Sequence, residues 1–312
     1  MAILFNSPQD DAGEFEAWRK PLLAADPAMD LRYWPDTGPV EDIEYALVWL
    51  PKPGDLRRYP NLKVIFNLGA GVDKLLADKT LPEHVPIVRL VDPGLTAGMS
   101  EYVLLHALRY HRSLPELEAQ QHRREWRQRL YPLAKHRKIG IMGLGVLGAD
   151  AAAKLRALDF DVAGWSQSPK SLPGVTSFHG TDGLAPFLAR SEILVCLLPL
   201  TAETRGILDA RLFARLPKGA FLINAARGQH LVDADLLAAL ESGQIAHATL
   251  DVFHTEPLPT DHPFWSHPKV TVTPHVASLT QPETAIPVVL DGIRRHKAGL
   301  PIPNTVDLKR GY

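Results

Sequence analysis

Short apolar segments alternate with helix-like segments from about residue 138 onward, and this rhythm limits the possible folds more than any other feature of the chain. The apolar segments end in Gly or Pro clusters, and the stretches between them place apolar residues three or four apart. The strand candidates are KIGIMG, FDVAGW, SEILVCLLPL, AFLINAARG, IAHATLDVF and KVTVTPH. Strands and helices in alternation favour right-handed crossovers and a parallel sheet that is covered on both faces.

Three segments between these strands have a helical pattern. They are AAAKLRAL, ETRGILDARLFARL and DADLLAALESG. In the last of them we expect Asp233 to cap the helix and Gly243 to end it, because these residue types favour those two positions.

The first hundred residues show the same alternation less clearly, and 312 residues are enough for two domains of ordinary size. The segments AILFNS, DLRYWP, YALVWLP, LKVIFNLGAG and PIVRLVD predict a second, smaller doubly wound parallel sheet. A long helical stretch at 100–122 would cross between the domains, and a helical tail after about residue 282 would return to the first. We therefore expect a smaller domain at 1–99 and 283–312, and a larger domain at 100–282.

Composition and charge exclude several classes of protein. Thirty-four basic and thirty-five acidic side chains give a formal charge of −1, so no overall field draws the chain to nucleic acid or to an anionic membrane. The densest basic run, HRREWRQR at 122–129, predicts a solvated helix face, and nucleic-acid contact there is the weaker alternative. No nucleic-acid partner is expected.

The cysteine content and the N-terminal segment both favour a cytoplasmic protein. The single cysteine, Cys196, lies in an apolar run and is expected to be an inert core thiol. MAILFNSPQD lacks the basic and apolar regions of a secretory signal, and no stretch approaches 18 uninterrupted apolar residues. We expect neither secretion nor insertion in a membrane.

A glycine-rich turn, GLGVLG, places Gly143, Gly145 and Gly148 at GxGxxG spacing between a strand candidate and a helix candidate. The three glycines would serve the tight turn, the approach of backbone to a pyrophosphate, and close packing of helix on strand. The N-terminus of the helix would then offer N–H groups to the phosphates. In this context the motif predicts dinucleotide binding, and a purely structural turn is the alternative.

The stretch AGWSQSPK at 163–170 lacks the acidic residue that commonly follows such a turn by about twenty positions. A carboxylate there would bind a ribose 2′-hydroxyl and repel a 2′-phosphate. Ser166, Ser168 and Lys170 instead predict a modest site for a 2′-phosphate, and the alternative is a polar turn with a solvated lysine. Gln167 neither repels nor strongly attracts the phosphate.

Three charged or titratable residues follow the carboxyl ends of successive predicted strands. They are Arg227 after FLINAA, Glu256 soon after ATLDVF, and His275 after VTVTP. Parallel strands bring these ends to one edge of the sheet, where ligands bind. Each residue alone could be structural, but their convergence beside a nucleotide turn indicates an active site.

Several blocks in this order and spacing resemble the D-isomer-specific 2-hydroxyacid dehydrogenase family. They are NAARGQHLVDADLLAAL, ATLDVFHTEPLPTDHPFW and VTVTPHVAS. Further segments resemble the glyoxylate/hydroxypyruvate reductase A branch of that family: LVWLPKP, LGAGVD, GVLG, the WS-S-K turn, DVF-EPLP and the terminal RGY.

The resemblance implies an α/β fold with a Rossmann NAD(P)-binding domain and a smaller flavodoxin-like, substrate-binding domain, with the active site in the cleft between them. It implies that Arg227, Glu256 and His275 are catalytic and that Asp251 lies near the nicotinamide. Related enzymes are dimers built through the nucleotide-binding domain, so we expect a homodimer in which the segment around Trp126 is a candidate arm.

Two larger sets of binding residues are expected on this basis. The cofactor would be bound by Gly143, Gly145, Val146, Leu147, Gly148, Ser166, Ser168, Lys170, Leu198, Pro199, Ala225, Asp251 and Ala277. The substrate would be bound by Trp49, Ala70, Gly71, Val72, Met99, Arg227 and His275, with its carboxylate on backbone amides around Ala70, Gly71 and Val72. No metal is expected.

These roles agree with the chemistry of reducing a 2-oxo acid. Arginine offers a planar, permanently charged fork for the carboxylate and carbonyl oxygens. An imidazolium can give a proton to the alkoxide that hydride transfer leaves, and Glu256 paired with His275 would favour the charged ring. LGAGVD could form a backbone nest for an anion. Trp49, Leu50, Met99 and Trp265 could line a pocket, although such residues are more often core.

The missing ribose acid favours NADPH over NADH. Gln167 stands where the reductase A branch commonly has an arginine, so the expected preference is small and NADH stays possible. Glyoxylate and hydroxypyruvate are implied by the resemblance alone. The alternatives are an NADH-dependent 2-hydroxyacid dehydrogenase of another substrate and, less favoured, a nucleotide-sensing binding protein without catalysis.

Overall fold

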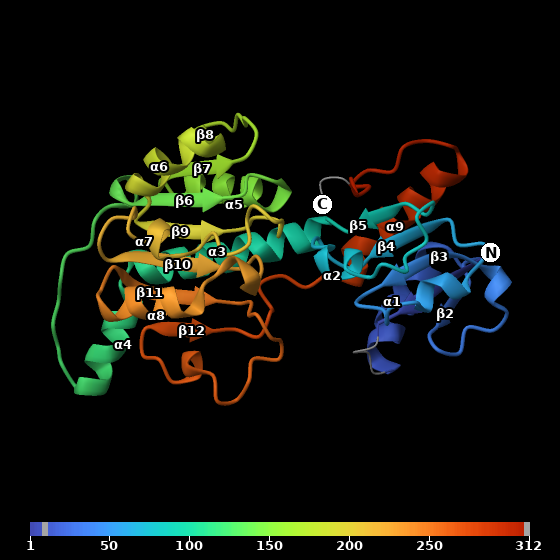
Figure 1. The fold of residues 1–312 in the computed structure, drawn as a ribbon, viewed down its shortest axis with the longest axis horizontal. Helices are drawn as coiled ribbons and strands as arrows, with labels where there is room; N and C mark the ends of the chain where they lie inside the picture. Colours follow the sequence, from blue (N-terminus) through green and yellow to red (C-terminus); the bar gives the residue numbers. More distant parts are fainter. Residues whose placement is uncertain (8–11, 309–312) are drawn as a thin grey trace. The chain divides into compact units, whose positions relative to one another are not determined.

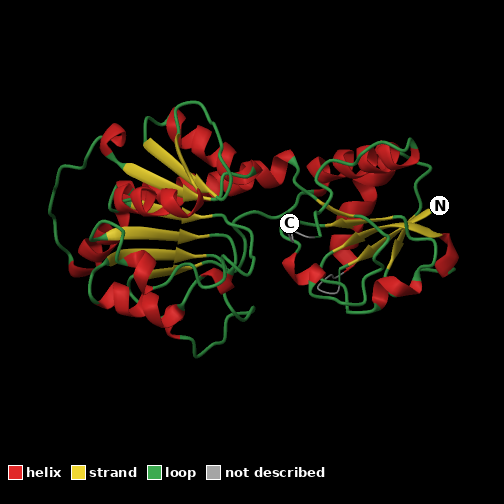
Figure 2. Cartoon of the chain, turned by 45° about the horizontal axis from the view of Figure 1, so that its top comes forward, coloured by secondary structure: helices red, strands yellow, loops and turns green. Residues whose placement is uncertain are grey.

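The computed structural model describes residues 1–7 and 12–308, and its chain forms two compact units. Unit 1 comprises Met1–Leu95 and Leu279–Tyr312, and unit 2 comprises Thr96–Ser278. The sequence places the two boundaries after residues 99 and 282, whereas the structure places them after residues 95 and 278. Each unit contains one parallel sheet with helices beside it (Figure 1, Figure 2). The terminal RGY lies outside the described residues.

Unit 1 is built on five parallel strands in the order β2-β1-β3-β4-β5. Its strands are β1 (Ala2–Asn6), β2 (Leu31–Tyr33), β3 (Ile43–Val48), β4 (Val64–Asn67) and β5 (Ile87–Arg89). Its helices are α1 (Ala12–Ala25), α2 (Asp73–Leu76), α9 (Pro282–Lys297) and the 3₁₀ helices η1 (Val40–Asp42) and η2 (Asp55–Arg58). This is the strand order of flavodoxin-like folds.

Both faces of the unit 1 sheet are buried, because side chains alternate along each strand. In β1, Ile3 and Phe5 join a core with Trp18 of α1 and Ile293 of α9, whereas Ala2 and Leu4 face the opposite core. Helix α9 packs against α1, so the C-terminal segment completes unit 1, as the sequence predicts.

Unit 2 is built on seven parallel strands in the order β12-β11-β10-β9-β6-β7-β8. The strands are β6 (Lys138–Met142), β7 (Asp161–Ser166), β8 (Thr176–His179), β9 (Ile193–Cys196), β10 (Ala220–Asn224), β11 (Ile245–Leu250) and β12 (Val270–Val272). The α-helices are α3 (Pro93–His111, which begins in unit 1), α4 (Leu114–Arg123), α5 (Val146–Ala157), α6 (Gly180–Arg190), α7 (Ala210–Phe213) and α8 (Asp233–Glu241). The 3₁₀ helices are η3 (Ala134–His136), η4 (Gly228–His230) and η5 (Pro263–Trp265).

The order of strands in unit 2 reverses between β6 and β9, which is the Rossmann switch point where dinucleotides bind. Strand β9 shows why both faces are covered. Ile193 and Val195 belong to one core and Leu194 and Cys196 to the other. Cys196 is fully buried, as predicted, and burial raises the pKa of its thiol to about 12. An unreactive thiol is the consequence.

Some local predictions were wrong. The expected helix at 100–122 is two helices, because Ser113 adopts a left-handed φ of 52° between α3 and α4 and Pro115 stands in the first turn of the second helix. Most of ETRGILDARLFARL is turn, and only α7 is α-helical. Asp233 is the first residue of α8 and caps nothing, because its carboxylate faces the rings of His254 and His262 instead.

The basic run at 122–129 is also not a helix face, because α4 ends at Arg123 and the chain then continues without regular structure. Its charges are partly balanced, since Arg123 pairs with Glu116 and Glu125. Among the helices of residues 1–7 and 12–308, none combines the length and the hydropathy needed to cross a membrane.

Candidate active site

The glycine turn joins β6 to α5 at the switch point and has the geometry that a dinucleotide site needs. Gly143 has a φ of 103°, and a Cβ there would lie 2.7 Å from the carbonyl oxygen of Leu197. A Cβ on Gly148 would lie 1.9 Å from the carbonyl oxygen of Gly143, so only glycine lets the helix approach the turn. A Cβ on Gly145 would meet nothing within 4 Å, which leaves open space before the N-terminus of α5. Phosphates fit there, because the first N–H groups of a helix have no partner within it.

The stretch expected to meet the adenosine ribose lies at the end of β7. Gln167, Ser168 and Lys170 are exposed, whereas Ser166 is largely buried and its hydroxyl donates to the carbonyl oxygen of Ser168 at 2.7 Å. The proton of Ser166 is therefore used within the turn. The groups that this stretch presents to solvent are the Ser168 hydroxyl, the Lys170 ammonium and the Gln167 amide, and none of them is a carboxylate.

Arg227 follows β10 and is fixed by its backbone and by its neighbours. Its carbonyl oxygen accepts from Asn224 Nδ2 at 3.1 Å, and its guanidinium Nη1 donates to the Ala226 carbonyl at 2.8 Å. The next residue, Gly228, touches the loop after β11, since a Cβ there would lie 1.9 Å from the backbone carbon of Phe253. This contact holds the Arg227 loop against the loop that carries Glu256.

Glu256 and His275 form the expected pair. The ring Nδ1 of His275 lies 3.1 Å from Glu256 Oε2, and the side chains are 32% and 20% exposed. The other carboxylate oxygen, Oε1, accepts from the backbone N–H of Phe253 at 3.1 Å. The loop after β11 therefore fixes the carboxylate, and the carboxylate fixes the orientation of the ring.

His275 lies in a turn that is held by Asp251. Its backbone has a φ of 55°, and its N–H donates to the carbonyl oxygens of Asp251 at 2.8 Å and Thr273 at 3.0 Å. The carboxylate of Asp251 is 1% exposed and accepts from the N–H groups of Val276 and Ala277, each at 2.9 Å. Burial raises the pKa of Asp251, while hydrogen bonds from Thr273, Ala277 and Val276 and the charge of His275 oppose that rise.

The loop expected to bind the substrate carboxylate follows β4 in unit 1. Asn67 is 2% exposed, and its Nδ2 donates to the carbonyl oxygens of Gly69 and Gly71, both at 3.0 Å. A Cβ on Gly69 would lie 2.8 Å from the indole of Trp49, so the two loops pack closely. These two bonds fix the conformation of the loop in which the backbone amides of Ala70 and Gly71 lie.

The remaining predicted residues differ in their exposure. Leu198, Ala225 and Ala277 follow the carboxyl ends of β9, β10 and β12 and are buried, and Met99 is 7% exposed within the core around α3. Val146 and Trp265 are 56% and 52% exposed. Pro199 is exposed too, and its carbonyl oxygen lies 3.2 Å from His230 Nε2.

The sequence model for the NAD-binding domain of the D-isomer specific 2-hydroxyacid dehydrogenases matches residues 104–277. Glyoxylate/hydroxypyruvate reductase A of Serratia proteamaculans is 46% identical over 321 aligned residues, covering 100% of both chains. The chain belongs to the D-isomer specific 2-hydroxyacid dehydrogenase family.

Two solved structures of similar chains agree. A D-isomer specific 2-hydroxyacid dehydrogenase from Xanthobacter autotrophicus, in complex with NADPH and MES, has a TM-score of 0.95 and 47% identity, covering 100% of this chain and 99% of that one. An NADPH-dependent glyoxylate/hydroxypyruvate reductase from Sinorhizobium meliloti, in complex with NADP and sulfate, has a TM-score of 0.91 and 40% identity, covering 100% of both chains. The α/β fold with two parallel sheets, predicted from the sequence, is confirmed.

Sequence reasoning missed the residues that hold the site loops. Asn67 at the end of β4 and Asn224 at the end of β10 each bind the loop that follows with a buried amide, and Thr273 binds the carboxylate of Asp251. The available signal was a polar residue in the last position of an otherwise apolar strand. Such a residue is costly to bury unless it has partners, so its presence indicates a loop that must be held.

Proposed function

We propose that this protein reduces small 2-oxo acids with NADPH, converting glyoxylate to glycolate and hydroxypyruvate to D-glycerate. The observation that carries the proposal is the His275–Glu256 pair at 3.1 Å, held at the same sheet edge as Arg227 and the glycine turn. Relatives that are similar over their full length bear the name of this activity.

We assign the proton donor to Nε2 of His275, because Nδ1 lies against the Glu256 carboxylate. The nicotinamide supplies the hydride when it is bound. Hydride addition to the carbonyl carbon moves the π electrons onto oxygen, and that alkoxide takes the proton from Nε2. Glu256 holds the ring by Nδ1–H and stabilises its positive charge before the transfer.

Arg227 is assigned to the substrate, where its guanidinium would bind the carboxylate and the reacting oxygen. The backbone amides around Ala70, Gly71 and Val72 are assigned to the carboxylate. Trp49 and Met99 would limit the size of the substrate. The donor set is cationic or neutral, as a small carboxylate anion requires.

NADPH is the cofactor that the 2′ region favours. Ser168 and Lys170 are exposed at the end of β7, and no carboxylate stands among them to repel a phosphate. Similar chains have been solved with NADPH and NADP. The Ser166 proton is used within the turn, so the preference rests mainly on Lys170 and NADH remains a second substrate.

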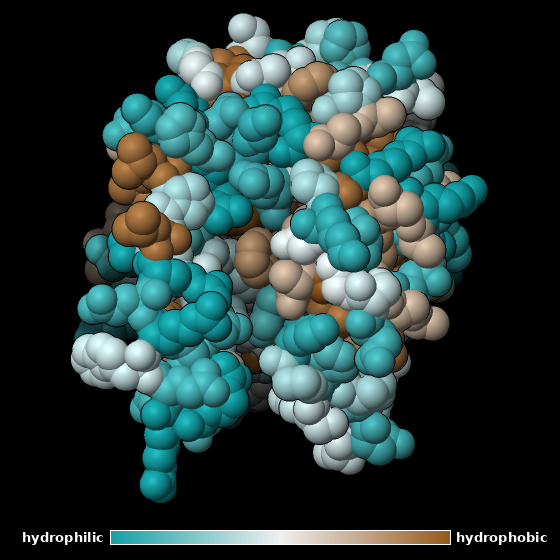
Figure 3. All heavy atoms as spheres, turned by 90° about the vertical axis from the view of Figure 1, so that its left-hand side faces the viewer, coloured by the Kyte–Doolittle hydropathy of each residue, from teal (hydrophilic) through white to brown (hydrophobic). Residues whose placement is uncertain are grey.

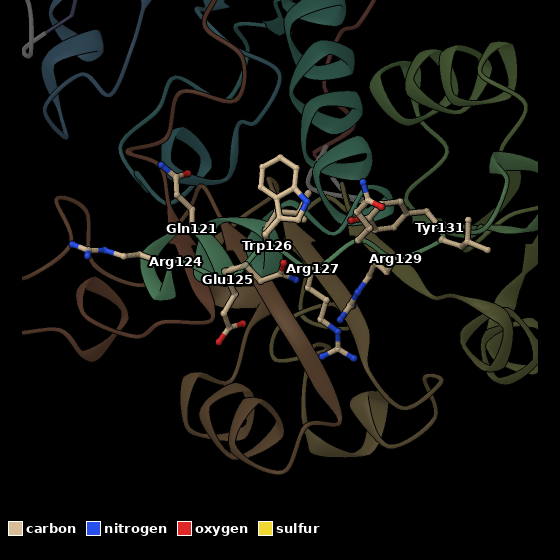
Figure 4. A pocket seen from close by; sticks show the side chains of 11 residues that line it. Gln121, Arg124, Glu125, Trp126, Arg127, Arg129 and Tyr131 are labelled. Carbon is tan, nitrogen blue, oxygen red and sulfur yellow. The ribbon is translucent and has the colours of Figure 1, made fainter.

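A homodimer through unit 2 is the assembly that we propose. In the segment after α4, Trp126 is 93% exposed, Leu130 is 100% exposed and Leu133 is 62% exposed. It lines a hollow of about 980 Å³, in which Trp126 points to the opposite side from Glu125 and Arg127 (Figure 4). Figure 3 shows hydrophobic side chains among hydrophilic ones on the side of the molecule where this segment lies. Apolar exposure of this size favours a protein partner.

Light scattering during gel filtration tests the dimer. We expect twice the 34.4 kDa mass of the chain for the wild type and a monomer for Leu130→Asp. An unchanged mass for this variant would place the interface elsewhere, and a monomeric wild type would refute the dimer. A cytoplasmic location is proposed as well, in keeping with a single, buried cysteine.

Initial rates test the function. Purified protein with NADPH should oxidise the cofactor when glyoxylate or hydroxypyruvate is added, and kcat/KM should be lower with NADH than with NADPH. A higher kcat/KM with NADH would overturn the cofactor preference. Binding of NADPH without any oxidation across a panel of 2-oxo acids would instead favour a nucleotide-sensing binding protein.

A further inference from the structure

Tyr102 of α3 lies at the end of a chain of hydrogen bonds that leads to the His275 turn. Its hydroxyl is 2.8 Å from Thr273 Oγ1, and Thr273 Oγ1 donates to Asp251 Oδ1 at 2.6 Å. Tyr102 is 8% exposed and Asp251 is 1% exposed, so the bonds are shielded from water. All three residues belong to unit 2.

The direction of these bonds follows from the number of protons. An ionised carboxylate is only an acceptor, so the single hydroxyl proton of Thr273 must point to Asp251. Thr273 can then only accept from Tyr102. The tyrosine therefore donates, and it polarises the Thr273 hydroxyl toward the carboxylate, which strengthens the second bond.

The turn needs this support because of the backbone of His275. A φ of 55° is unfavourable for a residue with a side chain, by roughly 1–2 kcal/mol. The Asp251 carboxylate offsets that cost by binding the next two N–H groups, those of Val276 and Ala277. Loss of one of the three donors to Asp251 would let the turn relax and move the imidazole away from Glu256.

We propose that Tyr102 is a positioning residue for His275, acting through Thr273 and Asp251. This inference rests on the proposed function, in which His275 gives the proton. Tyr102 also lies in the buried core that α3 shares with Val195 and Ile223 of the sheet, so its ring packs the helix against the strands whether or not the hydroxyl is present. The hydroxyl is therefore the part of the side chain that serves the turn.

Helix α3 offers a matched control two turns further on. The hydroxyl of Tyr110 is fully buried and is 2.6 Å from Thr249 Oγ1 and 3.2 Å from His247 Nδ1, both in β11. It joins the same helix to the same sheet, but its partners lie in β11 and not in the turn at 273–277. Tyr110→Phe and Tyr102→Phe each delete one buried hydroxyl, and only the second reaches His275.

The kinetic test compares four variants with the wild type. Tyr102→Phe should lower kcat about fivefold and Thr273→Val about 10- to 30-fold, with the Kd of NADPH unchanged. Thr273→Ser keeps the hydroxyl and should retain most of the wild-type kcat. Tyr110→Phe should lower Tm by at least as much as Tyr102→Phe while leaving kcat within about twofold of the wild type.

The pH profile separates positioning from packing. The titratable groups that face Asp251 are Tyr102 from α3 and His275 from the turn after β12. Because the Thr273 bond lowers the pKa of Asp251, its loss raises that pKa, and the acid limb of kcat should move to higher pH in Thr273→Val and, by less, in Tyr102→Phe. A role in packing alone would lower Tm and leave the acid limb in place.

The outcomes separate the inference from the function on which it rests. Wild-type kcat and an unmoved acid limb in Tyr102→Phe, with an active wild type, would overturn the inference alone. Equal losses of kcat in Tyr102→Phe and Tyr110→Phe would overturn it too, because they would reflect packing. No NADPH oxidation by the wild type would overturn the proposed function, whatever the variants show.

Discussion

Histidines lie in two very different environments in unit 2. His275, at the carboxyl edge of the sheet, has a side chain that is 32% exposed and lies against Glu256. His106 of α3 and His247 of β11 are 5% and 6% exposed, and both lie close to buried hydroxyls, Thr249 Oγ1 at 3.3 Å and Tyr110 at 3.2 Å. Burial and, to a smaller extent, the positive charge of Arg109 lower the pKa of each buried ring to about 4.

The exposed His275 is placed to serve activity, whereas the buried His106 and His247 serve stability, although all three lie in unit 2. At the carboxyl edge a strained turn presents an imidazole beside a carboxylate, which suits a group that must carry and give up a proton. Below that edge the same residue type is held neutral, where it serves packing and hydrogen bonding. A change of pH should therefore act on turnover through one set of residues and on unfolding through the other.

Among the variants considered, loss of Arg227 should lower catalytic activity the most. Arg227→Ala removes the fork assigned to the carboxylate and the reacting oxygen, so we expect kcat/KM for glyoxylate to fall by about 10³-fold or more. The Kd of NADPH, measured by fluorescence titration, should stay within a few fold of the wild type. Retention of wild-type kcat/KM would remove Arg227 from the site.

Replacement of Glu256 should lower catalytic activity by less than replacement of Arg227 does. Glu256→Gln keeps the size of the side chain but cannot stabilise a positive ring, so kcat near neutral pH should fall about 10- to 100-fold. Initial rates at saturating NADPH and glyoxylate measure this. Because Glu256 Oε1 also accepts from the Phe253 N–H, a parallel measurement of Tm should show that the loop persists. An unchanged kcat would mean that Glu256 only shapes the loop.

Acid should destabilise the fold through the two buried histidines, His106 and His247. The unfolded histidines have a pKa of about 6.5 and the folded ones of about 4, so the unfolded chain binds more protons in between and stability falls as pH falls. Each histidine should contribute about 2 kcal/mol to the loss between about pH 7 and pH 5. Urea unfolding at the two pH values measures the total, and His247→Gln should make the pH dependence shallower. A pH dependence as steep as in the wild type would contradict this.

The smallest expected effect concerns the cofactor. Lys170→Ala removes an exposed ammonium at the end of β7, so the KM for NADPH should rise about 5- to 10-fold while that for NADH hardly changes. Gln167→Arg is the complementary variant and should lower the KM for NADPH. Equal effects of Lys170→Ala on both cofactors would place the 2′-phosphate elsewhere.

Much of the architecture could be predicted because its signals are local. Strand alternation gave the two sheets, and the glycine spacing gave the turn at the switch point. Arg227, Glu256 and His275 could be grouped because parallel strands end at one edge. The break at Ser113, the place of Asp233 beside two histidines, and the irregular chain after Arg123 could not be predicted, because each depends on contacts far along the sequence.

The residues that hold the site loops in place were harder to predict for the same reason. Tyr102 and Thr273 are 171 positions apart, and neither lies in a motif of its own. Asn67 was visible as a polar residue at the end of an apolar strand, but its two partners depend on how the following loop folds back. Contacts between residues far apart in the sequence decide which conformation a loop adopts. The spacing of apolar residues along the chain carries no information about such contacts.

Turnover by His275→Ala tests whether His275 gives the proton. With NADPH and glyoxylate at saturating concentrations, we expect kcat to fall by about 10²- to 10⁴-fold while the Kd of NADPH stays near the wild-type value. His247→Gln, measured alongside, should keep its kcat. Wild-type turnover by His275→Ala would contradict a role for His275 as the proton donor, even though the chain would still belong to the same family.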